Sequence, residues 1–458
     1  MLICLALSAC RAPAFIEPAA ARVSITFAVP DWELQWGSVS KVVAEFERQN
    51  PDIHVVLKSS SEILGLPPNA FAIKDDTWRR LAAAADVFRI PLSGGLPRQA
   101  AHEGSVRDLK PFVEADSTFR AGDFYPGALE AASWDGGLWA LPTALDYEVI
   151  LFDKAAFAAA GMAYPQPGWS WDELAQAATA LTVSNAGQVT RWGFVDEAFV
   201  HFPGQYVELR AGALLEQTGV PPTPLFTSEG AVTATQWWAD LIRKAQAMPF
   251  PDAPRGDGAG SSLVEQKLVA MASYSLQGAA SRVRTKPQEF GVVPYPTASP
   301  IWLEQLCMSA GAAHPEAAWR WLNFATRQMP FSMPSEADYR GLLPARRSVA
   351  QAASFWEGLP EEVATTLRYA VDHAAHSSLP DWPAASQPLN AALLAVFRGE
   401  RSAEEALAAA QAQASTELQR EAGRLAAVTP APLRVATAEP PPAADAIRIT
   451  FLATGDVS

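Results

Sequence analysis

The sequence predicts an α/β protein in which central β-sheets are flanked by helices. Two stretches rich in β-forming side chains, at 23–29 and 53–57, enclose a segment whose apolar residues recur at helical spacing. Another strand-like run, at 147–152, leads into further helical segments. A helix that connects two neighbouring strands implies that these strands are parallel, which is the arrangement found in α/β proteins.

The composition supports more than one folded core. The chain has 458 residues, of which 49% are hydrophobic and 18% are charged. A chain of this length divides into about two or three domains, and this composition favours a packed interior over disorder. The formal net charge of -14 argues against a nucleic-acid-binding surface, because binding to phosphates requires clustered Lys and Arg. Beyond the start of the chain, no stretch reaches the roughly 18 consecutive apolar residues of a membrane-spanning helix.

The first strand, at 23–29, ends at the Pro-Asp-Trp sequence of residues 30–32. A helix follows it, with apolar residues at helical spacing that we expect to face the core: Val39, Val42, Val43 and Phe46. Asn50-Pro51-Asp52 ends this helix before the second strand. A later strand, at 85–88, places Arg89 directly at its end.

The middle of the chain contains the clearest local signals. An Asp-Gly-Gly sequence at 135–137 predicts a turn, and residues 147–152 form a strand followed by a short helix that Gly161 ends. Ser170 and Glu173 form a capping box, in which each side chain satisfies a free amide at the start of a helix over 172–183. Further helices are predicted at 229–245 and within 389–418, the latter with a second capping box at Ser402 and Glu405.

The motifs of common enzymes are absent from the sequence. It contains no G-x-S-x-G, H-E-x-x-H or phosphate-binding G-x-x-x-x-G-K-S/T pattern. His373 and His376 have no obvious further ligands nearby, so we predict neither a metal site nor a cofactor. Asp146 and Glu148 share one face of a strand, and two carboxyl groups can hydrolyse a glycoside, but this spacing is a poor match to that arrangement. We therefore predict no catalytic residues.

Three motifs in register over residues 137–174 resemble the bacterial extracellular solute-binding proteins of the sugar type, the receptors of ABC importers that include maltose-binding protein. They are Gly-Leu-Trp-Ala-Leu-Pro at 137–142, Leu-Phe-Asp-Lys at 151–154 and Ser-Trp-Asp-Glu-Leu at 170–174. Similar matches to the family occur at 46–53, 308–325, 341–345 and 398–407, so the resemblance covers roughly residues 22–427.

The resemblance implies a periplasmic-binding-protein-like fold of type II, with two lobes, a hinge and a cleft between the lobes. Each lobe has a central β-sheet flanked by helices, and the chain crosses between the lobes near 143–147, 305–309 and 341–345. The expected organisation is a signal peptide and tether at 1–21, lobe one at 22–144 and 308–341, lobe two at 145–306 and 345–427, and a Pro/Ala-rich linker at 428–445.

The family's function would be capture of an extracellular solute and its delivery to an ABC transporter permease by lobe closure, without catalysis. Asp146 stands where the family has a carboxylate near the hinge that contacts sugar, although it could instead make only a structural hydrogen bond. Trp382, in a Pro-Asp-Trp-Pro turn expected to be exposed, is the favoured stacking platform, and Gln277 replaces a Trp that many relatives carry. The full set of expected ligand-binding residues is Asp146, Tyr147, Asp31, Trp32, Glu33, Arg89, Tyr274, Gln277, Trp302 and Trp382.

The mixed charges near these positions favour a neutral solute, such as a mono- or oligosaccharide, over a phosphate ester. Two alternatives remain open at this stage: a secreted carbohydrate-active enzyme, and a ligand-sensing partner of a membrane signalling protein. We expect a monomer that binds no nucleic acid.

The two ends of the chain suggest an anchor and an extension. Leu-Ser-Ala-Cys at 7–10 resembles a bacterial lipobox, which would make Cys10 the lipidated residue and place the protein outside the cytoplasmic membrane, held by a lipid anchor. No Lys or Arg precedes Cys10, which departs from the usual signal peptide. Residues 446–458 repeat the Ile-Thr-Phe of the first strand, which is either the start of a truncated second domain or an accidental match. Cys4 lies in the same short leader, so Cys307 has no partner for a disulfide and is expected to be a buried small hydrophobe.

Overall fold

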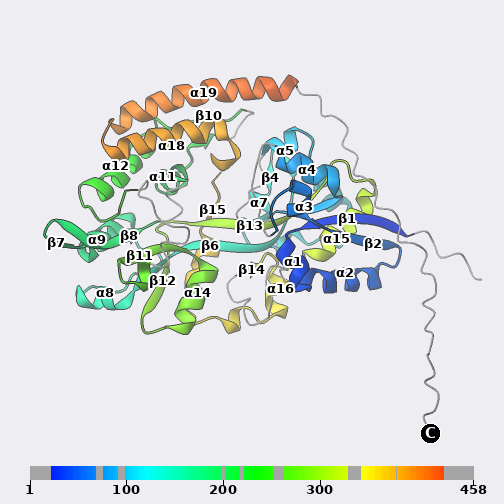
Figure 1. The fold of residues 1–458 in the computed structure, drawn as a ribbon, viewed down its shortest axis with the longest axis horizontal. Coiled ribbons are helices and arrows are strands. Elements are labelled where there is room, and N and C mark those ends of the chain that lie inside the picture. The colour runs from blue at the N-terminus through cyan, green and yellow to red at the C-terminus, as the bar shows by residue number, and fades with distance from the viewer. Residues whose placement is uncertain are drawn as a thin grey trace, which may run out of the picture.

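The computed structural model describes residues 22–68, 76–90, 98–196, 202–216, 221–250, 263–328, 342–377 and 379–427. The predictions for Cys10, for the linker at 428–445 and for residues 446–458 lie outside these ranges. Two groups of helices surround one long, continuous sheet whose strands follow the order β2-β1-β3-β13-β6-β11-β8-β7 (Figure 1). The α/β class predicted from the sequence is confirmed.

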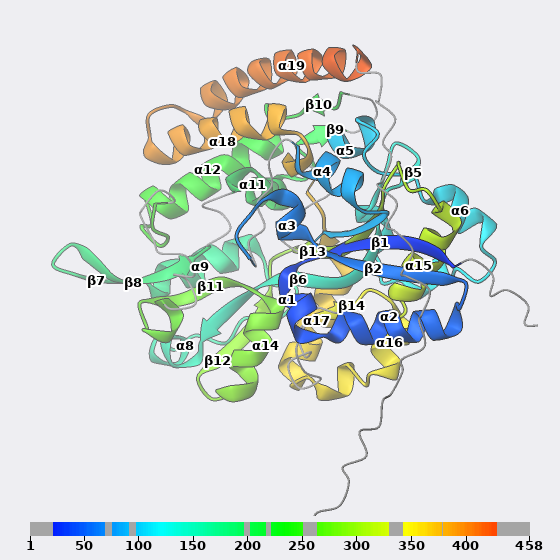
Figure 2. The same cartoon turned by 45° about the vertical axis from the view of Figure 1, so that its right-hand side comes forward.

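The N-terminal β-α-β unit forms as its sequence pattern predicts. Strand β1 (Val23–Val29) pairs in parallel with β2 (Ile53–Ser59) over its whole length, and with β3 (Val87–Ile90) on its other edge. Helix α2 (Ser38–Gln49) connects β1 to β2 and buries Val39, Val43 and Phe46. Helices α2 and α4 (Thr77–Ala84) lie on opposite sides of these strands, so the sheet is covered on both faces (Figure 2).

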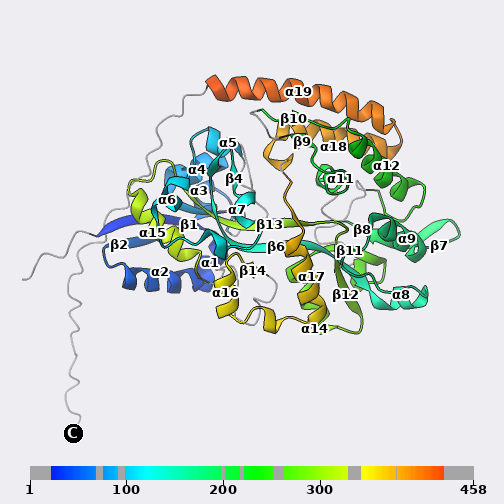
Figure 3. The ribbon, with the colours of Figure 1, turned by 180° about the vertical axis from the view of Figure 1, so that it is seen from behind.

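Two long strands run from one lobe into the other. Strand β6 (Leu141–Asp153) pairs with β13 (Ser299–Met308) through its first half, and with β11 (Val269–Ser275) and β12 (Phe290–Pro294) through its second half. Strand β14 (Leu343–Pro344) pairs with residues 144–145 of β6. The described parts of the three predicted crossing segments therefore lie side by side at the centre of the molecule (Figure 3).

Helices cover the sheet in both lobes. Those around the first lobe are α1 (Asp31–Trp36), α3 (Ser60–Leu64), α5 (Arg98–His102), α6 (Lys110–Ala115), α7 (Ala128–Ala131) and α15 (Pro315–Ala325), together with α2 and α4. Those around the second lobe are α8 (Lys154–Ala159), α9 (Trp171–Leu181), α11 (Pro203–Ala211), α12 (Glu229–Arg243), α14 (Leu276–Thr285), α17 (Glu361–Asp372), α18 (Pro383–Arg398) and α19 (Ala403–Ala427). Helix α16 (Arg347–Ala352) follows β14, and the outer strands of the second lobe are β7 (Val183–Asn185) and β8 (Gln188–Val195).

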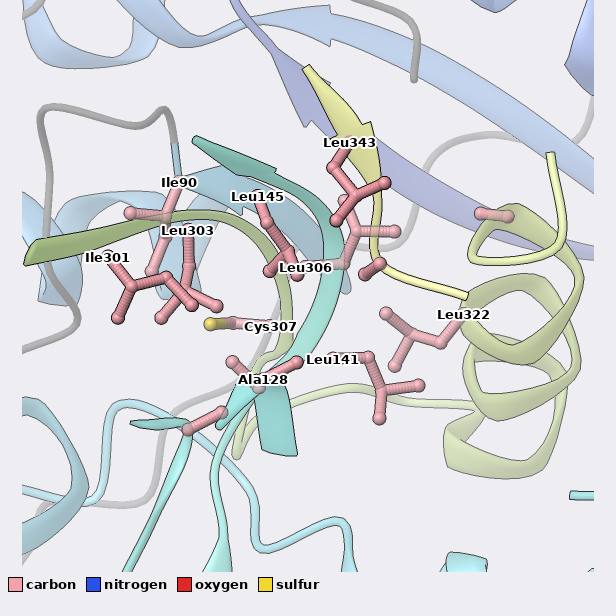
Figure 4. Close-up of a cluster of buried hydrophobic side chains, with 14 of the residues drawn as sticks. Ile90, Ala128, Leu141, Leu145, Ile301, Leu303, Leu306, Cys307, Leu322 and Leu343 are labelled. Carbon is pink, nitrogen blue, oxygen red and sulfur yellow. The ribbon is translucent and has the colours of Figure 1, made fainter. Parts of the chain in front are cut away.

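The described residues form two large buried clusters. One extends from the first lobe through the hinge strands to α14 and α17, and the other lies within the second lobe. Cys307 is free and fully buried in the first cluster, among aliphatic side chains of β6 and β13 such as Leu145 and Leu303 (Figure 4). The prediction that Cys307 acts as a buried hydrophobe is confirmed.

The segment that follows β14 stays on the first lobe longer than the sequence suggested. Arg347 donates to the carbonyl oxygens of Gly122 and Phe124 at 2.8 Å, and Trp356 Nε1 donates to the hydroxyl of Tyr125 at 2.9 Å. Glu362, further along the chain, accepts a hydrogen bond from Lys154 of the second lobe. We therefore place the start of this part of lobe two after residue 356 rather than at residue 345, because these bonds fix the intervening segment to lobe one.

The last two helices cross the top of the molecule. Helix α18 packs in the second lobe, and α19 extends from it over the first lobe (Figures 1 and 3). Near the end of α19, Glu421 is close enough to Glu103 and His102 of the first lobe to interact electrostatically with both, and its pKa is raised chiefly by burial. No helix among the described residues has the length and apolar character needed to cross a membrane.

The predicted capping box at the start of α9 is confirmed. Ser170 accepts a hydrogen bond from the Glu173 amide at 3.1 Å, and Glu173 accepts one from the Ser170 amide at 2.6 Å. We expect Ser170→Ala to lower the free energy of unfolding by about 1 kcal/mol, because an amide in the first turn loses its acceptor. Urea denaturation measures the change. Ser184→Ala, at an exposed serine, is the control, and an equal effect of both variants would contradict the prediction.

Candidate functional site

The register of the two crossing strands brings four side chains to one face. Asp146 of β6 lies directly opposite Trp302 of β13, and Ala144 lies opposite Glu304. Residues opposite each other in an antiparallel pair, and residues two apart along a strand, share a face. Asp146, Glu148, Trp302 and Glu304 therefore occupy the same side of the sheet, which we call the hinge face.

A buried arginine joins the hinge face to the first lobe. Arg89, on β3, pairs through Nη2 with Glu304 and through Nη1 with Glu33 of α1, the latter at 2.5 Å. These three side chains are almost completely buried. Burial raises the pKa of Glu33 to about 7, although the positive charge of Arg89 opposes this increase. Burial acts to lower the pKa of Arg89, but Glu304 and Glu33 outweigh it and keep the guanidinium charged.

Asp146 is held in place by backbone amides. Its Oδ1 accepts hydrogen bonds from the amide of Tyr147 at 2.9 Å and from that of Gln277, at the start of α14, at 3.4 Å. The carboxyl is 3% exposed, and burial raises its pKa to about 7 despite these donors, with a further contribution from Glu304. At neutral pH this group can therefore exist with or without its proton.

Two more buried carboxyls lie in the second lobe, each bonded to a tyrosine. The Tyr206 hydroxyl donates to Glu148, and the Tyr295 hydroxyl donates to Asp196 at 2.6 Å. Burial raises the pKa of Glu148 well above its ordinary value, and the charge of Asp196 adds to this effect. The carboxyls of Glu33, Glu304, Asp146, Glu148 and Asp196 thus form a continuous series, since each one affects the ionisation of its neighbour.

The hydroxyl of Tyr206 should contribute measurably to this network. We expect Tyr206→Phe to lower the free energy of unfolding by about 1–2 kcal/mol, because a buried carboxyl loses a hydrogen-bond donor. Chemical denaturation at pH 7 checks this expectation. Tyr164→Phe, at a residue 42% exposed, is the matched control and should change stability by less than about 0.5 kcal/mol. A Tyr206→Phe protein as stable as the control would contradict this role for the hydroxyl.

Several predicted site residues lie around the hinge face with partly accessible side chains. Trp302 is half-buried beside Asp146, and Gln277 is half-buried at the start of α14. In α1, Trp32 is half-buried, while the carboxylate of Asp31 accepts hydrogen bonds from the hydroxyls of Ser59 and Ser61.

Three predicted residues do not join this group. Tyr274 lies opposite Val149 in the pairing of β11 with β6, so it points to the face opposite the hinge face, where the guanidinium of Arg282 lies over its ring at 4.5 Å. Tyr147 alternates with Asp146 along β6, so it points to the opposite face, where it is fully buried in the core opposite Ile301. Trp382 was expected in an exposed turn, but it is 2% exposed and belongs to the buried cluster of the second lobe. Trp382 is the residue directly before α18. The apolar face of α18 packs in the core of the second lobe, so the side chain of Trp382 is buried there as well.

Four residues near the hinge face were missed as site residues in the sequence: Glu304, Tyr206, Asp196 and Tyr295. Glu304 could have been found from its spacing, because it lies two residues after Trp302 and directly before the predicted crossing segment at 305–309. The other three carry no local signal. The sequence suggested Glu148 only as a possible second carboxyl, with Asp146, for glycoside hydrolysis and not as a binding residue. No group of three His, Cys, Asp or Glu side chains suited to a metal occurs in the part of the chain that the structure describes.

Comparison with known proteins identifies the family. The model for "bacterial extracellular solute-binding protein" matches residues 37–329. The chain belongs to this family. Its relative, the erythritol/L-threitol-binding protein of Mycolicibacterium smegmatis, is 23% identical over 341 residues, which cover 65% of this chain and 68% of the relative.

Solved structures of binding proteins share the fold. The sugar-binding protein MalE from Xanthomonas citri aligns with a TM-score of 0.68 and 17% identity, over 89% of this chain and 100% of MalE. The ABC substrate-binding protein Lmo0181 from Listeria monocytogenes, in complex with cycloalternan, aligns with a TM-score of 0.64 and 18% identity, over 87% of this chain and 99% of that protein. The predicted two-lobed periplasmic-binding-protein fold is therefore confirmed, and the function of this solute-binding protein is to capture a solute outside the cell.

Proposed function

We propose that the captured solute is a carbohydrate or a polyol, and that the protein delivers it to the permease of an ABC importer. The observation that carries this proposal is the hinge face, where the half-buried Trp302 lies beside the carboxyl of Asp146. Aromatic rings pack against the C–H faces of sugars, and carboxyl groups accept hydrogen bonds from hydroxyls. The solutes named for the relatives, erythritol or L-threitol and cycloalternan, have this chemistry.

Both lobes would contribute contacts to the solute. In the second lobe, Gln277 donates to Asp146 through its backbone amide, and its half-buried side chain would offer an amide donor and acceptor. In the first lobe, Asp31 and Trp32 follow the end of β1 and supply a second carboxylate and a second aromatic ring. Arg89 and Glu33 are both buried, so they would not contact the solute directly. They would hold Glu304 of the hinge face in position. Closure of the lobes about β6 and β13 would then enclose the solute and present a changed surface to the permease.

The remaining parts of the proposal concern the setting of the protein. A lipid on Cys10 would hold the receptor at the cell membrane, and the chain would work as a monomer with permease subunits as its partners. It would perform no catalysis and need no cofactor. The absence of the common enzyme motifs from the sequence and the membership of a family of binding proteins both support this role.

A thermal-shift screen of the purified chain against mono- and oligosaccharides, polyols and amino acids tests the proposal. A solute that binds only the folded state stabilises it by about 2.7 kcal/mol when present at a hundredfold excess over its dissociation constant. We expect a saturable shift with one class of hydroxylated solute, and its loss in Trp302→Ala. Trp237→Ala, at a half-buried tryptophan in the second lobe, is the control and should keep the shift. Shifts with amino acids alone would overturn the proposal.

A further inference from the structure

A groove in the surface of lobe one lies between α2, α6 and α15 and has a volume of about 580 Å³. Four aromatic side chains line it: Phe46, Phe112, Trp319 and Phe324. Figure 2 shows these three helices gathered at the end of lobe one where β1 begins. None of the lining residues belongs to the hinge face, so this groove, which we call the outer groove, is separate from the candidate solute site.

The aromatic lining of the outer groove is held in place by contacts within lobe one. The ring of Phe112 stacks on Trp319 with 5.7 Å between the ring centres, and Phe46 lies 5.3 Å from Phe324. Trp319 Nε1 also donates to the carboxylate of Asp116 at 3.0 Å, which fixes the indole. Phe112 and Phe324 are only half-buried, so part of their apolar surface is free to contact a further side chain. A preformed hollow with an apolar floor is typical of a binding site.

The outer groove opens beside the start of β1. The amide of Val23 donates to the carbonyl of Asp52 at 2.8 Å, and Arg22 Nε donates to the carbonyl of Pro51 at 2.9 Å. The carboxylate of Asp52 pairs at 2.7 Å with Arg320, which lines the groove. The residues that precede β1 are therefore attached to the fold within a few residues of the groove.

Residues 11–21, which lie outside the described ranges, carry one pair of large apolar side chains. Their sequence is Arg-Ala-Pro-Ala-Phe-Ile-Glu-Pro-Ala-Ala-Ala, in which only Phe15 and Ile16 are both large and apolar. The chain from Phe15 to Arg22 can span up to about 23 Å when it is extended. Helix α15, which forms one side of the groove, is about 17 Å long. Phe15 and Ile16 can therefore reach any part of the groove.

We propose that Phe15 and Ile16 bind in the outer groove, so that the segment that precedes β1 docks on lobe one. The ring of Phe15 would pack against Phe112 and Trp319, since aromatic rings favour stacked and edge-to-face contacts with one another. With the lipid proposed on Cys10, this contact would hold lobe one next to the membrane and leave lobe two to move about the hinge strands. The inference goes beyond the proposed function, because no part of it depends on the solute.

Photo-crosslinking of the full chain tests the inference. Phe15 is replaced by photoreactive p-benzoylphenylalanine, the protein is irradiated, and the adducts are located by mass spectrometry. We expect adducts within the chain at the segments that line the outer groove, 46–50, 111–118 and 316–327. The same probe at Ala19 is the control. Because Ala19 is nearer to β1, simple proximity along the chain predicts more adducts from position 19, whereas docking predicts more from position 15.

A variant that blocks the groove sharpens the test. Ala115 lines the groove as the exposed last residue of the six-residue helix α6, so Ala115→Arg places a long side chain there without disturbing the core. We expect about tenfold fewer adducts from position 15, which corresponds to a contact weakened by about 1.4 kcal/mol. Ala159→Arg, at the exposed last residue of the six-residue helix α8, is the matched control and should leave the yield unchanged.

Each other outcome overturns the inference. Adducts that join two chains would show that a second copy fills the groove. Adducts with other parts of the chain, adducts that persist in Ala115→Arg, or none from position 15 would show that Phe15 does not bind there. These results leave the proposed function untouched, because the thermal-shift screen measures solute binding separately.

Discussion

Replacing Arg89 by methionine should lower the free energy of unfolding by about 3–5 kcal/mol at pH 7.5. The guanidinium is 1% exposed and lies between Glu33 and Glu304, which are also buried. Removal of one partner from a buried ion pair leaves a charge without compensation, and here two carboxyls would be left together. Methionine approximates the length of the arginine stem, so the effect should reflect the lost charge more than a lost volume.

The pH dependence and a control separate this effect from simple loss of packing. In Arg89→Met, Glu33 can escape the penalty by binding a proton, because burial already raises its pKa to about 7, so the stability deficit should shrink between pH 7.5 and pH 5. Arg320→Met removes a half-exposed arginine that pairs with Asp52 at 2.7 Å, and should cost no more than about 1 kcal/mol. A deficit below about 1 kcal/mol in Arg89→Met, or one that is equal at both pH values, would show that the buried triad is not electrostatically important. Urea denaturation followed by circular dichroism provides the measurement.

Asp146→Asn should make the folded protein more stable at pH 8 by about 2–4 kcal/mol, while weakening solute binding. The folded state raises the pKa of Asp146 from 3.8 to about 7, and a tenfold change in an acid dissociation constant corresponds to about 1.4 kcal/mol. Between these two pH values the folded state binds more protons than the unfolded state, so the stability contributed by protonated Asp146 falls as pH rises. Asparagine does not ionise, so the variant escapes this decrease.

The difference in the free energy of unfolding between Asp146→Asn and the wild type should therefore be small at pH 4, increase towards pH 7 and remain constant above pH 7. The asparagine Oδ1 can still accept from the amides of Tyr147 and Gln277, so the local geometry should persist. Asp153→Asn is a useful comparison: Asp153 is a buried carboxyl of the same strand, but it pairs with Lys267 and caps α8. A pH-independent difference between wild type and Asp146→Asn would contradict a raised pKa. If Asp146 contacts the solute as proposed, the variant should gain stability and lose binding, which is the trade-off expected of a functional group held in an unfavourable environment.

Much of the fold could be predicted from the sequence because local signals determine it. The alternation of β-forming and helical segments predicted β1, α2 and β2 with nearly correct bounds. The capping box at Ser170 fixed the start of α9, since its hydrogen bonds join residues three apart in the chain. The motifs at 137–142, 151–154 and 170–174 pointed to the family that the comparison then identified.

The candidate site was predictable only in part. The sequence indicated Asp146, Trp302 and Arg89 one at a time, from their positions at strand ends and crossing segments. It could not show that Arg89 binds both Glu33 and Glu304, because the three residues come from distant segments of the chain. The sequence also led us to expect accessible side chains at Tyr147 and Trp382, and both are buried. Which face of a strand is buried, and whether a turn is exposed, depend on the segments that pack against them.

The sequence by itself therefore determined the family, the order of the strands and helices, and the crossing segment that carries Asp146. Tertiary structure decided the pairing of β6 with β13, and with it which side chains share the hinge face. The physical reason is that periodicity and capping act between residues a few positions apart, whereas register and burial arise only when distant strands meet. The cluster of buried carboxyls around Asp146 is of this second kind, because carboxyls from both lobes come together only in the folded chain.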